Sequence, residues 1–156
     1  MKKKDNPGVY LPPPLIYVFV FLFSLWVNKM VPLREELTGK KYSLTMGILF
    51  ILIAAMIIFA AIFRFIISGN TLVTIKPAKS LQAIGIYRVS RNPMYLGLVF
   101  LYTGLAFLKG NTWTILFIPL IIIFVQAFVI RKEEKYLLRT FGNEYENYRS
   151  KVRRWL

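Results

Sequence analysis

Four long apolar runs, separated by short polar segments, dominate the pattern of this chain. They cover residues Leu15–Val27, Leu44–Ile67, Tyr95–Leu108 and Thr112–Ile130. A helix rises about 1.5 Å per residue and the hydrocarbon core of a bilayer is about 30 Å thick, so the second run can cross it. The third run would reach only about 21 Å. The pattern predicts about four transmembrane helices.

Turn-forming residues divide the second half of the chain. Lys109-Gly110-Asn111 predicts a tight hairpin between the third and fourth runs. Pro119 predicts a kink in the fourth run. Gly142 is suited to end a helix, and Asn143 with Glu146 forms a possible capping box for the next one.

The chain becomes polar after Ile130 but keeps a helical period. Apolar residues recur at spacings of three and four, which places them on one face: Leu138, Phe141, Tyr145, Tyr148, Val152 and Trp155. This predicts an amphipathic helical segment, and a helix resting on anionic lipid would explain it without any further function. The expected fold is therefore all-α: a single-domain polytopic membrane protein with an amphipathic C-terminal cytoplasmic segment.

The distribution of basic residues predicts the orientation. If the N-terminus, residues 68–94 and the C-terminal segment share one side, that side carries fifteen of the 21 Lys and Arg residues and the other carries five, while Arg64 can reach toward the richer side. The positive-inside rule then places both termini in the cytoplasm. We expect an integral protein of a prokaryotic cytoplasmic membrane.

Composition removes several classes of function. The chain has no cysteine and no histidine, which excludes disulfides, thiolate chemistry and the commonest general base, and we expect no metal site. The net charge of +14 is typical of nucleic-acid-binding proteins, but most of these charges flank apolar runs, so we expect no nucleic-acid partner.

The segment Gly85–Gly97 combines basic, turn-forming and aromatic residues just before an apolar run. Arg88 and Arg91 are three residues apart and could face one anion on a helix. Asn92 suits a helix N-cap and Pro93 its first turn. Separately, interfacial arginines and a capped helix account for these features, but their order and position favour a binding site.

The acidic pair Glu133-Glu134 follows the fourth apolar run. Adjacent helix positions point about 100° apart, so one glutamate can face a pocket while the other faces a cation. A solvated, charge-balanced helix exit would explain the pair by itself. The functional alternative is a carboxylate that binds the amine or ribose hydroxyls of a cofactor.

These motifs together resemble one family. Gly85-x-Tyr-Arg-x-x-Arg-Asn-Pro-x-Tyr-x-Gly97, then Glu133-Glu134-x-x-Leu137 and Phe141-Gly142-x-Glu-Tyr145-x-x-Tyr148, look like the C-terminal signature of the isoprenylcysteine carboxyl methyltransferase and phospholipid methyltransferase family of membrane enzymes. The similarity covers about residues 72–153. Residues 1–71 match only as two membrane helices, so residues 72–156 would form the cofactor-binding half of the domain.

The resemblance implies methyl transfer from S-adenosylmethionine to a lipid-like or prenylated acceptor, either an isoprenylcysteine-type carboxylate or a phospholipid amine, with membrane lipid as the other partner. From the residues themselves, Arg88 or Arg91 could bind a substrate carboxylate or phosphate, and Glu133 or Glu134 could serve as base for an amine, so we expect catalytic roles for Arg91 and Glu134. The cofactor-binding residues that the resemblance implies are Tyr87, Arg91, Asn92, Pro93, Tyr95, Gly97, Glu133, Glu134, Tyr145 and Tyr148. Eukaryotic members usually have histidine where this chain has Asn92, which cannot titrate.

Two alternatives stay open. Sterol and steroid reductases, which use a nicotinamide cofactor, have a similar Arg-x-Pro-x-Tyr-x-Gly stretch, but usually with an acid after the glycine, where this chain has Leu98. A non-enzymatic membrane protein could use its basic C-terminal segment to bind anionic lipid.

Overall fold

The structure, a computed structural model, describes residues 6–33, 40–69 and 78–156 and is all-helical over them. The N-terminal lysines, Lys76 and the expected boundary after residue 71 lie outside the described residues. The elements in order are α1 (Pro13–Met30), α2 (Lys40–Ile67), the 3-10 turn η1 (Gly85–Arg88), α3 (Pro93–Lys109), α4 (Thr112–Leu116), α5 (Ile118–Val125), the π-helix η2 (Gln126–Ile130), α6 (Arg131–Phe141) and α7 (Asn143–Lys151).

Three helical stretches are long and apolar enough to cross a membrane: α1, most of α2, and the stretch from Thr112 to Phe141. The third predicted run forms α3, which has 17 residues and is shorter than these three. At about 1.5 Å per residue it reaches about 26 Å, a little less than a hydrocarbon core of about 30 Å.

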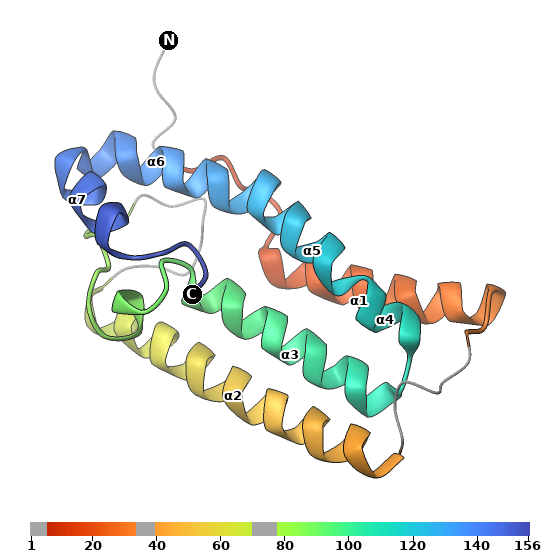
Figure 1. Ribbon diagram of the computed structural model, residues 1–156. Helices are drawn as coiled ribbons and strands as arrows, with labels where there is room; N and C mark the ends of the chain where they lie inside the picture. Colours follow the sequence, from red (N-terminus) through yellow and green to blue (C-terminus); the bar gives the residue numbers. More distant parts are fainter. Residues whose placement is uncertain (1–5, 34–39, 70–77) are drawn as a thin grey trace.

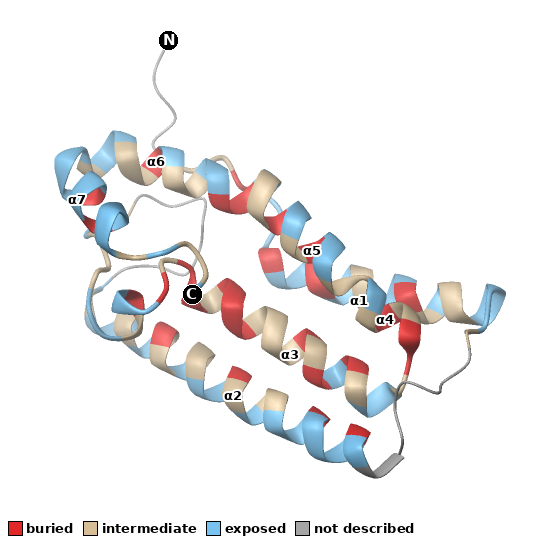
Figure 2. Ribbon diagram, viewed as in Figure 1, coloured by how far each residue is buried: buried red, intermediate tan, exposed pale blue. Residues whose placement is uncertain are grey.

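The helices pack as two neighbouring pairs (Figure 1). α2 lies along α3, and α1 lies beside α4 and α5 while also contacting α3. The outer faces are apolar and exposed, and Phe19 and Phe59 are 70% and 71% accessible. Figure 2 shows this exposure as pale blue along the outward surfaces of α1, α2 and α5. Lipid is the solvent that such faces require, so the chain is an integral membrane protein.

The predicted turn signals are largely confirmed. The fourth run is interrupted at Phe117, with Pro119 in the first turn of α5. Gly142 ends α6 with a φ of 51°, a left-handed conformation that favours glycine. The predicted capping box is wrong: α7 begins at Asn143 itself, its N-cap is Gly142, and no side chain caps it.

The apolar face predicted for the C-terminal segment packs on the protein instead of lying on lipid. Tyr145 and Tyr148 are buried in a cluster with Tyr87 and Ala61, and Phe141 packs against that cluster. The segment therefore forms part of the tertiary structure at the end of the bundle where α3 begins (Figure 1).

Gly104 sets the distance between α2 and α3. A Cβ at this position would lie 2.7 Å from Ile51 Cγ1 and 2.8 Å from the carbonyl oxygen of Gly47, so the two backbones touch. Gly104→Ala should therefore force the helices apart and lower the free energy of unfolding by about 1–3 kcal/mol, as other overpacked cores do. Thermal unfolding in detergent measures this. Ala55→Val, which enlarges an exposed side chain of α2, is the control and should leave the midpoint unchanged.

Candidate functional site

The turn that precedes α3 is bonded to the end of the chain. We call residues 152–156 the C-terminal tail. The Arg91 amide donates to the carbonyl of Arg153 at 3.0 Å, and Asn92 Nδ2 donates to the carbonyl of Arg154 at 3.0 Å. Asn92 and Pro93 occupy the N-cap and first turn of α3, as predicted. The Asn92 side chain, however, makes no cap hydrogen bond, and its Nδ2 donates to the tail.

Glu134 lies between two arginines. Arg154 binds it with both branches of its fork, Nε to Oε1 at 3.0 Å and Nη2 to Oε2 at 2.7 Å. Arg91 Nη2 lies 3.3 Å from the same Oε1. The Arg91 and Glu134 side chains are only 13% and 16% exposed, so water screens their attraction weakly. The hydrogen bonds to Glu134 raise the pKa of Arg154 above its usual value.

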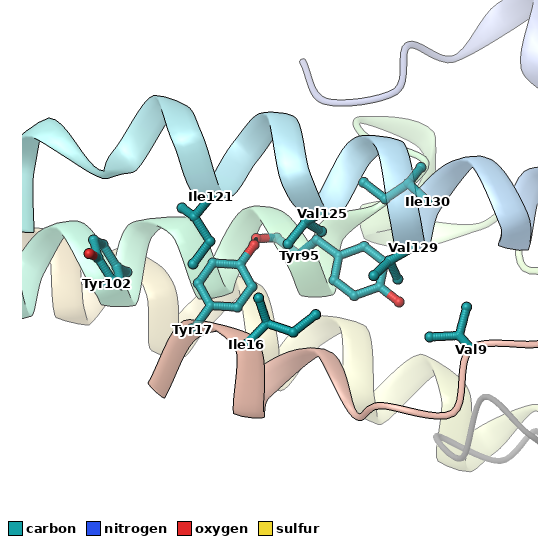
Figure 3. Close-up of a cluster of buried hydrophobic side chains, with 9 residues drawn as sticks. All are labelled: Val9, Ile16, Tyr17, Tyr95, Tyr102, Ile121, Val125, Val129 and Ile130. Carbon is teal, nitrogen blue, oxygen red and sulfur yellow. The ribbon is translucent and has the colours of Figure 1, made fainter. Parts of the chain in front are cut away.

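Glu133 faces a different partner from its neighbour. Its Oε1 accepts a hydrogen bond from the Tyr95 hydroxyl at 2.7 Å. The Tyr95 backbone carbonyl in turn accepts from the Tyr17 hydroxyl at 3.4 Å, which links α3 to α1. Figure 3 shows the Tyr95 and Tyr17 rings within an apolar cluster that includes Val125 and Val129. Glu133 therefore binds a tyrosine, whereas Glu134 binds two arginines.

The π-helix η2 lies just before this acidic pair. A π-turn contains one residue more than an α-turn, and such turns occur frequently at functional sites. Its first residue, Gln126, accepts a hydrogen bond from the Trp155 indole at 2.9 Å. The tail is therefore attached to α6, to η2 and to the turn before α3.

Three predicted tyrosines belong to one buried cluster, and one of them, Tyr145, contacts Arg91. Arg91 Nη1 lies 3.4 Å from the Tyr145 hydroxyl. The Tyr148 hydroxyl donates to the carbonyl of Tyr87 at 2.6 Å, and the Tyr145 and Tyr148 rings meet edge to face at 6.2 Å. Burial raises the pKa of both Tyr145 and Tyr148 above the usual range, so both hydroxyls remain protonated near neutral pH and can donate hydrogen bonds.

The structure thus brings Arg91, Asn92, Tyr95, the two glutamates and Tyr145 together, with the Tyr87–Tyr148 pair beside them. Gly97 lies elsewhere: a Cβ there would come within 2.5 Å of Ile58 Cγ1, so it faces α2. Pro93 is fully buried.

Sequence reasoning missed Arg154, Trp155 and Gln126. Gln126 carried a usable signal, because it is the one side-chain amide within the apolar run Thr112–Ile130. Arg154 carried none, because it sits among other basic residues in the tail.

One donor in this cluster lacks a partner. The Arg91 Nε is buried and makes no hydrogen bond to any residue that the structure describes. A buried donor without an acceptor is costly, so the position favours a ligand that supplies one. The carboxylate of Glu134 lies close to this free donor. A ligand that bears both an acid and an amine would suit this arrangement, because the acid could accept from Arg91 and the amine could donate to Glu134.

A comparison with protein families decides the affiliation. The family model described as phospholipid methyltransferase matches residues 42–144, which include most of α2, all of α3, the acidic pair and the end of α6. The chain belongs to the phospholipid methyltransferase family. It is therefore a membrane methyltransferase of the phospholipid and isoprenylcysteine type, and the resemblance seen in its motifs is confirmed.

Two relatives illustrate the match. A protein-S-isoprenylcysteine O-methyltransferase of Schizosaccharomyces pombe is 38% identical over 68 residues, which are 44% of this chain and 29% of that protein. An uncharacterized protein of Haemophilus influenzae is 40% identical over 63 residues, 40% of this chain and the whole of that protein. No solved structure matches the chain.

Proposed function

We propose that this phospholipid methyltransferase family member uses S-adenosylmethionine to methylate a lipid-like acceptor at the cytoplasmic membrane face. The observation that carries the proposal is the Glu134–Arg91 pair beside the unpartnered Arg91 Nε. The cytoplasmic orientation rests on the charge asymmetry of the chain. It agrees with the position of the turn before α3, α7 and the tail at one end of the bundle (Figure 1).

The described residues fit this donor. Its amino-acid end is a zwitterion, for which Glu134 offers an anion and Arg91 a cation with a free buried N–H. Glu133, with Tyr95, offers polar groups to ribose hydroxyls, and the rings of Tyr145 and Tyr148 suit a cationic or flat group. Asn92 and Pro93 shape the turn, and Gly97 contributes through close packing of α3 on α2.

When bound, the donor supplies a methyl group that is already activated for displacement by its sulfonium. The protein's main task is then to position the acceptor and to exclude water. A carboxylate acceptor needs no base, and Arg91 could orient it. An amine acceptor must lose a proton, and the carboxylates of Glu133 and Glu134 are the groups of this cluster that can accept it. The acceptor itself is an isoprenylcysteine-type carboxylate or a phospholipid amine.

Titration calorimetry of the purified protein in detergent tests the proposal. We expect one-to-one binding of S-adenosylmethionine and of its demethylated product, with dissociation constants of roughly 1 μM to 1 mM, the range common for enzyme substrates. NADPH is the control ligand and should give no heat of binding. If neither the donor nor its product binds, the proposed cofactor is wrong; binding of NADPH alone would favour a reductase.

A further inference from the structure

A second concave site lies next to this cluster and shares Tyr148 with it. It is a pocket of about 410 Å³ between the segment around η1 and helix α7, and we call it the basic pocket. Its volume falls within the range of about 300–1,000 Å³ common for ligand sites. The residues that line it are Ala83, Arg88, Asn147, Tyr148, Lys151 and Val152.

The polar lining of the basic pocket is cationic. Arg88 comes from η1 and Lys151 from the last turn of α7, with the Asn147 amide one turn earlier. No carboxylate among the described residues forms an ion pair with Arg88 or Lys151. Glu144 occupies the same face of α7 but pairs with neither cation, and Glu146 pairs with Arg149. Two unpaired cations and an amide donor suit a phosphate group.

The walls of the basic pocket are joined before any ligand arrives. The Tyr148 hydroxyl, on one wall, donates at 2.6 Å to the carbonyl of Tyr87, the residue before Arg88 on the other wall. The Tyr87 ring also packs on Phe65 of α2, with centroids 5.8 Å apart. Binding of a ligand would therefore cost little conformational entropy, because these two walls are already held together.

The chain segments next to the basic pocket carry exposed apolar side chains. Ile84 and Val89, on either side of η1, are 53% and 56% exposed, and Ile66 at the end of α2 is 67% exposed. Exposed apolar side chains next to two cations without ion-pair partners are typical of a surface that inserts into the headgroup region of a bilayer. The phosphates of the headgroup region belong to phospholipids, so a lipid is the source that such a surface favours.

We propose that the basic pocket binds the phosphate of an anionic phospholipid, with Arg88 and Lys151 contacting the phosphate and the Ile84–Val89 segment contacting the acyl chains. This binding does not depend on methyl transfer. It would anchor α7, and with it Tyr145 and Tyr148, at the membrane surface. Inorganic phosphate would make the same contacts with Arg88 and Lys151, so the experiment must distinguish it from a phospholipid.

Native mass spectrometry of the detergent-solubilised protein can count bound lipids. The probes are phosphatidylglycerol, phosphatidylcholine and inorganic phosphate. We expect phosphatidylglycerol to remain bound where phosphatidylcholine does not. The double variant Arg88→Gln/Lys151→Gln should weaken phosphatidylglycerol binding at least about tenfold. The control Lys132→Gln/Lys135→Gln removes the same charge from exposed positions of α6 and should change binding less than about twofold.

A third variant tests the role of the cavity itself, without changing the charge around it. Asn147→Trp fills the cavity from an exposed helix position and leaves the net charge unchanged, so it should also weaken phosphatidylglycerol binding. Equal losses in the two charge variants would overturn the proposal in favour of non-specific attraction. Competition by inorganic phosphate at low concentration would overturn the lipid as the source. Donor binding, measured separately, should persist in all these variants, so failure here is distinct from failure of the proposed cofactor.

Discussion

Glu134→Gln is expected to weaken S-adenosylmethionine binding at least about 30-fold and to abolish methyl transfer. The carboxylate of Glu134 is the only acidic group that contacts Arg91 or Arg154 among the described residues, and it is 16% exposed. Removing a weakly screened charge from a binding site typically costs 2–5 kcal/mol, which corresponds to about 30-fold or more in affinity. Calorimetry with the donor and its product measures the loss.

The matched control for this change is Glu146→Gln. Glu146 is 56% exposed and pairs with Arg149 on the surface of α7, so its replacement should leave donor binding unchanged. Glu134→Gln removes the negative charge that pairs with Arg91 and Arg154, which can also lower the stability of the fold. Thermal unfolding must therefore be measured together with binding. Glu134→Asp keeps the charge on a shorter side chain and should fold with intermediate affinity. Wild-type affinity in Glu134→Gln would remove Glu134 from the site.

Arg154→Gln is expected to weaken donor binding about tenfold and to lower the unfolding midpoint. Arg154 orients Glu134 through both carboxylate oxygens, at 3.0 and 2.7 Å, and sits on a tail that bonds to Asn92. Glutamine cannot form the two parallel charge-assisted bonds, so Glu134 and the tail both become less ordered. Arg154 is therefore a positioning residue, because it acts through Glu134.

The adjacent residue provides a close control. Arg153 has an exposed side chain and contributes its backbone carbonyl to the Arg91 amide, so Arg153→Gln removes the same charge without changing that bond. It should leave donor affinity within about twofold of wild type, as surface substitutions usually do. Arg154→Lys keeps the charge but not the fork, and should recover part of the affinity. If Arg153→Gln and Arg154→Gln behave alike, the tail acts only through its net charge.

Local sequence patterns predicted most of the secondary structure. Apolar run lengths, Pro119 and Gly142 act within a few residues, and the structure has helices and breaks where these residues place them. The predicted cap at Asn143 failed because Gly142 takes the N-cap position itself, so the side chain of Asn143 is already inside the helix. Asn92 differs: it occupies the N-cap position of α3, yet its side chain makes no cap hydrogen bond and its Nδ2 donates to the tail.

By itself, the sequence of this chain determined an all-helical membrane protein, its family motifs and an acidic pair whose members point in different directions, because these follow from residue spacing. Only the tertiary structure decided which partner each member takes: Glu133 binds Tyr95, and Glu134 binds Arg91 and Arg154. It also decided that Gly97 packs on α2 and that Trp155 returns to Gln126. The physical reason is distance along the chain. Contacts between residues 20 to 60 positions apart depend on how whole helices pack, and no local pattern records that packing.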